Sequence, residues 1–173
     1  KDGWYYHGAT HRDAHPADTV YTMRQALAVS SNIALARMIT DGYNGSAKKF
    51  VNKLKRMGLC DSIDYIIPGA HQPRINIPKD TVTISRMAYG YSVELSPLQI
   101  LTFYNGIAND GRMISPVLVT EVKDGKTTVE SFETQTIRSS LCSKNTLEDI
   151  QASLLDVVWD NDLGTAAMNK WRQ

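Results

Sequence analysis

The run ALAVSSNIALARM, residues 26–38, places three polar residues inside an otherwise helix-favouring stretch. Ser and Asn compete with the helical backbone for its hydrogen bonds, so Ser30, Ser31 and Asn32 favour a cap or turn over a helix interior. A hydroxyl can relay a proton, and a carboxamide both donates and accepts hydrogen bonds. From the triplet alone, a helix cap or a Ser/Asn turn is the favoured interpretation, and a catalytic turn is the alternative.

A serine and a lysine three residues apart form a second candidate pair, Ser46 and Lys49. Such a pair can supply a nucleophilic hydroxyl and an amine that takes its proton. The run that follows, with Phe50 and Leu54 on one face, instead favours Ser46 as the N-cap of a helix that ends at Gly58. In that interpretation Lys49 faces solvent.

Three histidines recur at four-residue spacing near the start of the chain: His7, His11 and His15. On a helix they would share one face and could bind a metal. Gly8 and Pro16 disfavour a helix there. We therefore expect segment 1–20 to be an ordered loop whose histidines bind no metal.

The two cysteines, Cys60 and Cys142, lack the spacing of a zinc site. A disulfide between them is an alternative, but two free, half-buried thiols are the favoured interpretation. The composition is that of one globular domain: 173 residues, 42% hydrophobic, 21% charged, net charge +1. This balance does not favour a nucleic-acid partner, and no apolar stretch is long enough to span a membrane.

Apolar spacing and capping residues predict six or seven helices. Thr22, with Gln25 three residues later, predicts a capping box, and Ser96-Pro97 predicts an N-cap followed by Pro at the first helical position. The expected helices begin at Thr22 and cover 32–39, 46–57, 96–108 and 147–158, with a short one from about 163 and a helix or loop at 81–89. Residues 59–80 are expected to be extended, and Asp124-Gly125 predicts one β-hairpin within 114–132.

Two stretches together resemble the transpeptidase domain of penicillin-binding proteins, nearest to the monofunctional class B type of cell division or elongation. The first is the Ser-x-Asn box at Ser30-Ser31-Asn32. The second is GYSVELSPLQILTFYNGIANDGRMISPVLV, residues 90–119. The order and spacing of the two stretches make the match specific, and it extends from about residue 20 to the C-terminus.

The resemblance implies a peptidoglycan D,D-transpeptidase that cross-links stem peptides through a serine acyl-enzyme and is acylated by β-lactams. It assigns catalytic roles to Ser30 and Asn32, with no cofactor and no metal. The implied fold class is mainly α with a small β-hairpin. It would be the helical middle part of the α+β fold shared with serine β-lactamases, with the central sheet mostly missing.

The implied partners are peptidoglycan stem peptides, β-lactam antibiotics and other cell-wall synthesis proteins, without nucleic acid or membrane contact in this segment. The implied location is the periplasmic side of the bacterial inner membrane, with an N-terminal anchor helix outside this chain.

Two boxes of the family do not match. The nucleophile's Ser-x-x-Lys box should precede the Ser-x-Asn box, which places it before Lys1, and the Lys-Thr-Gly box should follow Gln173. Gly164-Thr165-Ala166 then belongs to the segment that precedes that last box. We therefore expect residues 1–173 to be a partial transpeptidase domain, inactive by itself, with an exposed apolar face that favours self-association.

Two alternatives remain. The chain could be a non-catalytic helical interaction module, in which Ser30 and Asn32 are ordinary caps. It could also be a β-lactamase or sensor of the same fold. Deacylation separates the latter from a transpeptidase, because a β-lactamase turns penicillin over.

Overall fold

The structure is a computed structural model that describes residues 3–14, 19–62, 71–77, 82–160 and 162–167. The chain divides into two compact units. Unit 1 comprises 1–53, 75–93 and 148–173, and unit 2 comprises 54–74 and 94–147.

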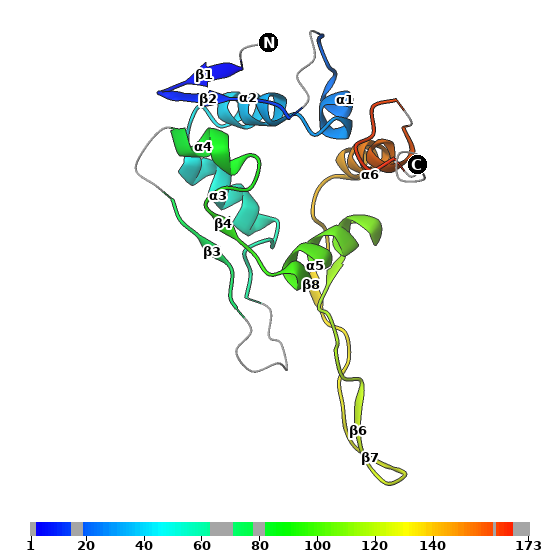
Figure 1. The fold of residues 1–173 in the computed structure, drawn as a ribbon. Coiled ribbons are helices and arrows are strands. Elements are labelled where there is room, and N and C mark those ends of the chain that lie inside the picture. Colours follow the sequence, from blue (N-terminus) through cyan, green and yellow to red (C-terminus); the bar gives the residue numbers. More distant parts are fainter. Residues whose placement is uncertain (1–2, 15–18, 63–70, 78–81, 161, 168–173) are drawn as a thin grey trace. The chain divides into compact units, whose positions relative to one another are not determined.

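Six helices and eight short strands occur in the described part of the chain (Figure 1). The helices are α1 (Met23–Ala28), α2 (Asn32–Gly42), α3 (Ala47–Arg56), α4 (Val82–Met87), α5 (Pro97–Ala108) and α6 (Lys144–Trp159). The strands are β1 (Trp4–Tyr6), β2 (Ala9–His11), β3 (Arg74–Ile75), β4 (Val93–Glu94), β5 (Met113–Ile114), β6 (Glu121–Asp124), β7 (Thr127–Ser131) and β8 (Thr136–Arg138). They form four two-stranded sheets, β1-β2, β3-β4, β5-β8 and β6-β7.

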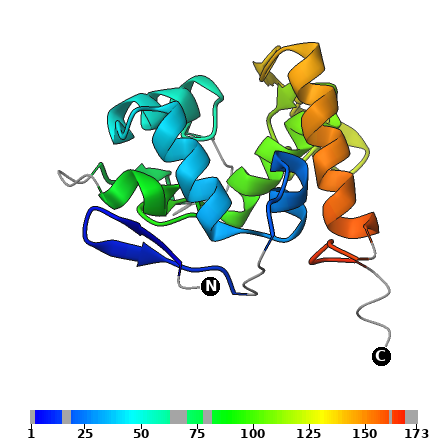
Figure 2. The same cartoon turned by 90° about the horizontal axis from the view of Figure 1, so that it is seen from above.

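Helix α2 is the centre of unit 1 and contacts α4, α1 and β2. Figure 2 shows it running between α4 and α1. Ala36 on α2 and Ile84 on α4 are completely buried, and the small alanine side chain lets the two helices approach closely. The apolar spacing of 32–39 predicts burial of Ile33, of Leu35 or Ala36, and of Ile39. Ala36 is buried, as is Thr40, whereas Ile33 and Ile39 are half-buried.

Residues 4–11 form a β-hairpin, so the expected loop over 1–20 is wrong there, whereas 12–14 and 19–20 contain neither helix nor strand. Tyr6 pairs with Ala9, and the two-residue turn between them has φ +44° at His7 and +90° at Gly8. Positive φ at both positions is the type I′ turn that matches the twist of paired strands. Asn is the usual residue before Gly in this turn, and His7 occupies that position here.

The histidines of this segment do not share a face. His7 is exposed in the turn, His11 is buried on β2, and His15 lies outside the described residues. Among the side chains that the structure describes, no cluster of three or more His, Cys, Asp or Glu could hold a metal ion.

In unit 2, α5 packs against β5 at Gly106. A Cβ on Gly106 would lie 3.0 Å from Leu141 and 3.1 Å from Met113, so a glycine permits the close approach. Met113 is 1% exposed and belongs to the core of this unit. The Cys60 and Cys142 thiols, also in unit 2, are free and half-buried, as the favoured interpretation expected.

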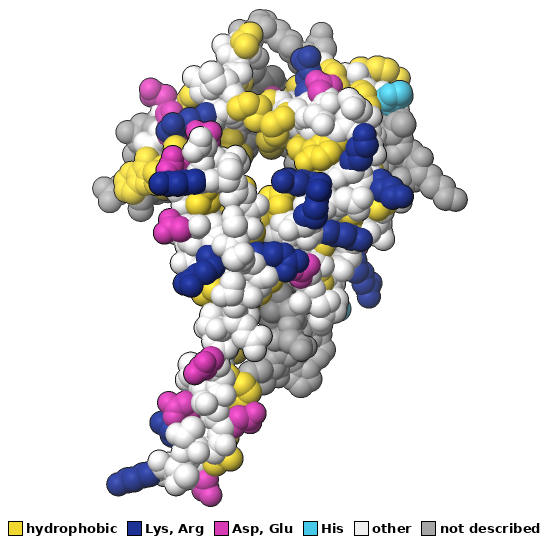
Figure 3. All heavy atoms as spheres, turned by 180° about the vertical axis from the view of Figure 1, so that it is seen from behind, with side chains coloured by type: hydrophobic (Ala, Val, Ile, Leu, Met, Phe, Trp, Pro, Cys, Tyr) yellow, Lys and Arg dark blue, Asp and Glu magenta, His cyan; other side chains and the backbone are white. Residues whose placement is uncertain are grey.

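The hairpin predicted around Asp124-Gly125 forms, but its turn is shifted by one residue. Asp124 pairs with Thr127, so Gly125 and Lys126 make the turn. Positive φ occurs at Gly125 and not at Lys126, which fits a type II′ turn rather than type I′. Every residue of β6 and β7 is exposed, and Figure 3 shows acidic, basic and apolar side chains interspersed along this hairpin.

The helix starts predicted at Thr22 and Ser96 are confirmed by hydrogen bonds, whereas the helix predicted from 147 begins at Lys144. Thr22 and Ser96 both form capping boxes, with Gln25 and Gln99, and Pro97 occupies the first turn of α5. Helix α4 forms where a helix or loop was expected. No helix begins at 163 in the described residues, because 162–167 fold into turns.

The described residues are mainly helical, as predicted, but contain two hairpins and two further strand pairs instead of a single hairpin. No helix within them has the length and apolar character needed to cross a membrane.

Candidate functional site

Helix α1 ends in a Schellman motif that contains Ser30. The Ser31 N–H donates to Ala26 O at 2.9 Å, and the Ser30 N–H donates to Leu27 O at 3.0 Å. This is the hydrogen-bond pattern of a helix end whose C′ residue is left-handed. Ser30 has φ +55° and occupies the position that glycine usually takes. The polar triplet therefore interrupts the helix, and the interruption leaves Ser30 in an unfavourable left-handed backbone conformation.

Ser31 faces the interior and begins α2. Its side chain is 4% exposed, and its Oγ donates to Asp13 Oδ2 at 2.8 Å. The same oxygen accepts the Ala34 N–H at 3.1 Å, which makes Ser31 the N-cap of α2. Ser30, in contrast, is exposed, and Asn32 is half-buried.

Residues 12 and 13 hold the other side of the turn. Asp13 Oδ1 accepts the Ile33 N–H at 2.9 Å, and the Arg12 carbonyl accepts from Asn32 Nδ2 at 3.3 Å. No local pattern in the sequence marks Arg12 or Asp13 as partners of the triplet, because 18 to 20 positions separate them from it.

The segment after α6 contacts the turn through Thr165. Its Oγ1 lies 3.1 Å from Ser30 Oγ, and its N–H donates to Ala28 O at 3.0 Å. Gly164 makes this contact possible. A Cβ there would lie 2.6 to 2.7 Å from the carbonyl oxygens of Asp156, Val157 and Asp160.

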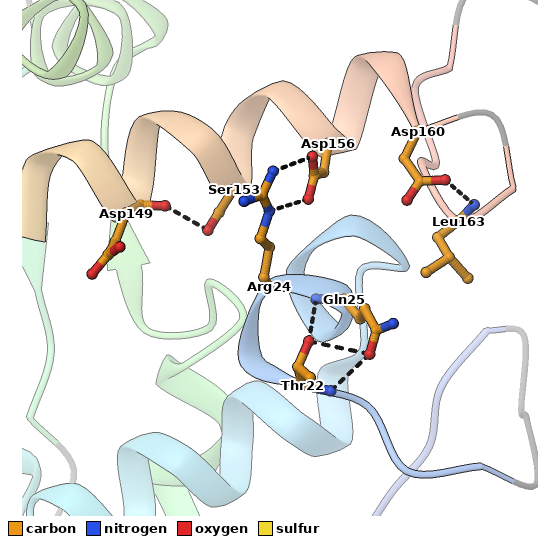
Figure 4. Close-up of polar contacts among 8 residues, drawn as sticks. All are labelled: Thr22, Arg24, Gln25, Asp149, Ser153, Asp156, Asp160 and Leu163. Carbon is orange, nitrogen blue, oxygen red and sulfur yellow. Dashed lines mark hydrogen bonds and ion pairs between the residues drawn. The ribbon is translucent and has the colours of Figure 1, made fainter.

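An ion pair joins α1 to α6 on the same side of unit 1 (Figure 4). The Arg24 guanidinium donates from Nε and Nη2 to the two carboxylate oxygens of Asp156. The hydrogen bond with Arg24 lowers the pKa of Asp156. Asp160 Oδ1 accepts the Leu163 N–H at 2.9 Å and so shapes the turn that leads to Thr165.

Ser46 is the N-cap of α3. Its Oγ accepts the Lys49 N–H at 3.4 Å, and its carbonyl accepts the Phe50 N–H at 3.2 Å. Lys49 is exposed, in agreement with the interpretation of this segment as an ordinary helix start.

Another serine, Ser85, lies next to His11 in the core of unit 1. His11 Nε2 is 3.0 Å from Ser85 Oγ, and His11 Nδ1 is 2.7 Å from the Tyr89 hydroxyl. His11 is 2% exposed and Ser85 is completely buried, so substrate cannot reach either. Burial, with the nearby charge of Arg86, lowers the pKa of His11. This trio ties β2 to α4 and is structural.

Unit 2 contains a cavity of about 400 Å³ between residues 71–74 and 94–97. His71, Arg74 and Glu94 contribute its charged and titratable side chains. Neither Ser30 nor Asn32 lines it, so the pocket is separate from the candidate turn.

The sequence matches the family model of the penicillin-binding protein transpeptidase domain over residues 1–172. Three solved structures share the fold. Penicillin-binding protein 2X of Streptococcus thermophilus has 18% identity and a TM-score of 0.71 over 87% of this chain and 21% of its own. A peptidoglycan glycosyltransferase of Burkholderia ambifaria has 21% identity and a TM-score of 0.72, and the match covers 94% of this chain and 47% of its own. Penicillin-binding protein A of Mycobacterium tuberculosis, an imipenem acyl-enzyme complex, has 17% identity and a TM-score of 0.71. The match covers 86% of this chain and 34% of its own.

The chain thus spans less than half the length of each of these solved relatives. The family match covers nearly all of the chain, including the turn at Ser30 and the segment at Thr165. This chain belongs to the penicillin-binding protein transpeptidase domain family.

Proposed function

We propose that this chain is part of the catalytic domain of a peptidoglycan D,D-transpeptidase, in which Ser30 relays a proton and Asn32 holds the substrate backbone. The nucleophilic serine and its lysine, and the Lys-Thr-Gly box, lie on segments outside residues 1–173. The length comparison supports this division, because the solved relatives are more than twice as long as the part that this chain matches.

The reaction has two steps. In the first step the nucleophilic hydroxyl loses its proton and attacks the D-Ala-D-Ala carbonyl, an ester bond forms, the amide bond breaks, and the departing amine takes a proton. In the second step an acceptor amine of another stem peptide attacks the ester carbonyl and loses a proton. The new amide bond forms, the ester bond breaks, and the nucleophile regains its proton. The exposed Ser30 hydroxyl can pass a proton in either direction, and the Asn32 amide offers both a donor and an acceptor to the substrate.

The observation that carries the proposal is the presence of serine at the left-handed C′ position of α1. Glycine would adopt this backbone without strain, but it has no hydroxyl. Positive φ also occurs at four other described non-glycine residues, but at Ser30 it coincides with the Ser-x-Asn box and with a contact to Thr165, 135 positions away. This combination supports a functional choice of serine.

β-Lactams are proposed to acylate the same centre. Penicillin-binding protein A of M. tuberculosis is described as an imipenem acyl-enzyme, and penicillin-binding protein 3 of that organism as complexed with aztreonam and with ampicillin. We place the enzyme on the periplasmic side of the inner membrane, where peptidoglycan lies, working with other cell-wall synthesis proteins in division or elongation.

The test is intact-mass measurement of the full-length protein after incubation with penicillin. We expect one stoichiometric adduct on a serine outside residues 1–173, slower acylation in S30A and N32A, and an unchanged rate in S46A. Residues 1–173 alone should remain unmodified. An adduct on Ser30 or Ser46 would overturn the assignment of roles, and rapid release of hydrolysed penicillin would indicate a β-lactamase.

A further inference from the structure

We propose that Asp13 is a positioning residue that fixes the Ser30–Asn32 turn for acyl transfer. This inference rests on the proposed function. Asp13 does not belong to the triplet, and it lies 18 positions from Ser31. It acts through the turn and not by contact with the substrate.

Each oxygen of the Asp13 carboxylate accepts a hydrogen bond, one from the residue before Asn32 and one from the residue after it. Oδ2 accepts from Ser31 Oγ at 2.8 Å, and Oδ1 accepts from the Ile33 N–H at 2.9 Å. Two hydrogen bonds from one planar group to the residues before and after Asn32 fix the direction in which Asn32 leaves the backbone. Both bonds involve a charged acceptor, which makes them stronger than bonds between neutral groups.

The neighbouring backbone then orients the Asn32 amide itself. The Arg12 carbonyl lies 3.3 Å from Asn32 Nδ2 and can only accept, so the nitrogen end of the amide must face it. Among the residues that the structure describes, no hydrogen bond to Asn32 Oδ1 or from its second N–H occurs, so both are offered to a lysine ammonium or a substrate amide. Residues 12 and 13 together thus determine which atoms of the Asn32 amide face the substrate.

The negative charge of Asp13 also stabilises the N-terminus of α2. This eleven-residue helix has no acidic residue in its first turn. The exposed N–H groups of a helix start favour a negative charge, and Asp13 supplies it from a segment distant in sequence. The same charge therefore stabilises the helix that begins at Asn32.

The experiment measures acylation of the full-length protein by a fluorescent penicillin at several concentrations. Saturation separates the dissociation constant of the first complex from the acylation rate constant. We expect D13A to lower the rate constant about tenfold or more, since a small misplacement of a catalytic group costs up to about a hundredfold. The dissociation constant should change little, because Asp13 does not touch the ligand.

Two further variants separate positioning from stability. D13N keeps the size of the side chain and one acceptor oxygen but loses the charge, so its rate constant should lie between those of D13A and wild type. S46A removes an N-cap of the same kind, at a cost of about 1 kcal/mol, without touching the turn, so it should match wild type in rate. Melting curves of all variants show whether the rate follows stability; a D13A rate that falls no further than that of S46A overturns the inference.

A double-mutant comparison identifies the route. If Asp13 acts through Asn32, D13A should have little further effect in an N32A background. An equal loss in both backgrounds contradicts the inference while leaving the proposed function intact. The proposed function fails instead if wild type is not acylated, or if N32A is acylated as fast as wild type.

Discussion

Two serines of unit 1, Ser31 and Ser46, begin helices and form the same local bond, yet their surroundings differ. Each Oγ accepts a backbone N–H three residues later, from Ala34 and Lys49. Ser46 is half-buried, and Lys49 beside it is exposed. Ser31 is 4% exposed and additionally donates to Asp13.

The difference shows what separates a capping serine from a serine in a site. A cap satisfies the helix start and needs only its own sequence neighbours. The Ser31 cap is bonded to a carboxylate from another segment and follows a left-handed serine whose hydroxyl meets Thr165. Convergence of distant segments on one turn, rather than the serine itself, marks the candidate site.

Removing the hydroxyl of Ser30 in two ways tests this distinction most strongly. S30A and S30G should both slow acylation of the full-length protein by about a hundredfold or more, the range of general acid–base catalysis. S30G should nevertheless be more stable than S30A by about 1 kcal/mol, because glycine adopts positive φ freely. Stopped-flow acylation and urea denaturation measure the two quantities. Equal stability of the two variants would remove the evidence for strain.

A methyl group on Gly164 should separate the Thr165 segment from the turn. The added Cβ would meet three backbone carbonyl oxygens at 2.6 to 2.7 Å, and none of these belongs to a flexible side chain. We expect G164A to lose about 2 kcal/mol of stability and to slow acylation. T165V, which keeps the backbone but loses the bond to Ser30 Oγ, serves as the milder control. Wild-type behaviour of G164A would show that this contact is dispensable.

Truncating the two capping serines compares them directly. S46A should cost about 1 kcal/mol, the usual value of an N-cap. S31A should cost about 2 kcal/mol, because it also leaves an oxygen of the half-buried Asp13 carboxylate without its donor. Thermal melts of both variants test the ranking; an equal loss would mean that the Asp13 bond adds nothing to the cap.

Lowering the pH should produce the smallest effect on stability, and it should act through His11 on β2, the strand that precedes Asp13. Burial first, and then Arg86, lower the pKa of His11, so the folded state prefers the neutral ring. The stability from neutral His11 is complete above its ordinary value of 6.5 and is lost as the pH falls through the lower folded value. H11Q should flatten this decline in Tm. An unaltered decline would assign it to other groups.

The sequence predicts well what depends on near neighbours. Thr22 with Gln25 and Ser96 with Gln99 form their capping boxes because each box needs only four consecutive residues. The hairpin at Gly125 was predicted with its turn one residue early, since Asp124 suits a turn as well as the strand end that it occupies. The hairpin at His7 was missed because histidine is an uncommon residue at positive φ.

The candidate site is predicted only in its centre. The polar interruption at Ser30 and Asn32 is visible in the sequence, because it conflicts with the helix around it. The contacts of Asp13 and Thr165 are not, because they join residues 18 and 135 positions apart. Packing of α2 against β2 and of the loop after α6 decides those contacts, and no local pattern encodes them.

The distance of 135 positions between Ser30 and Thr165 has a consequence for the order in which the protein is made. Synthesis runs from the N-terminus, so Asp13 and the turn leave the ribosome long before the segment that meets Ser30. Long-range contacts also form late in folding because closing a long loop is costly. The Asp13 contacts of the turn need no residue beyond Ile33, whereas the Thr165 contact can form only after nearly all of these 173 residues have been added.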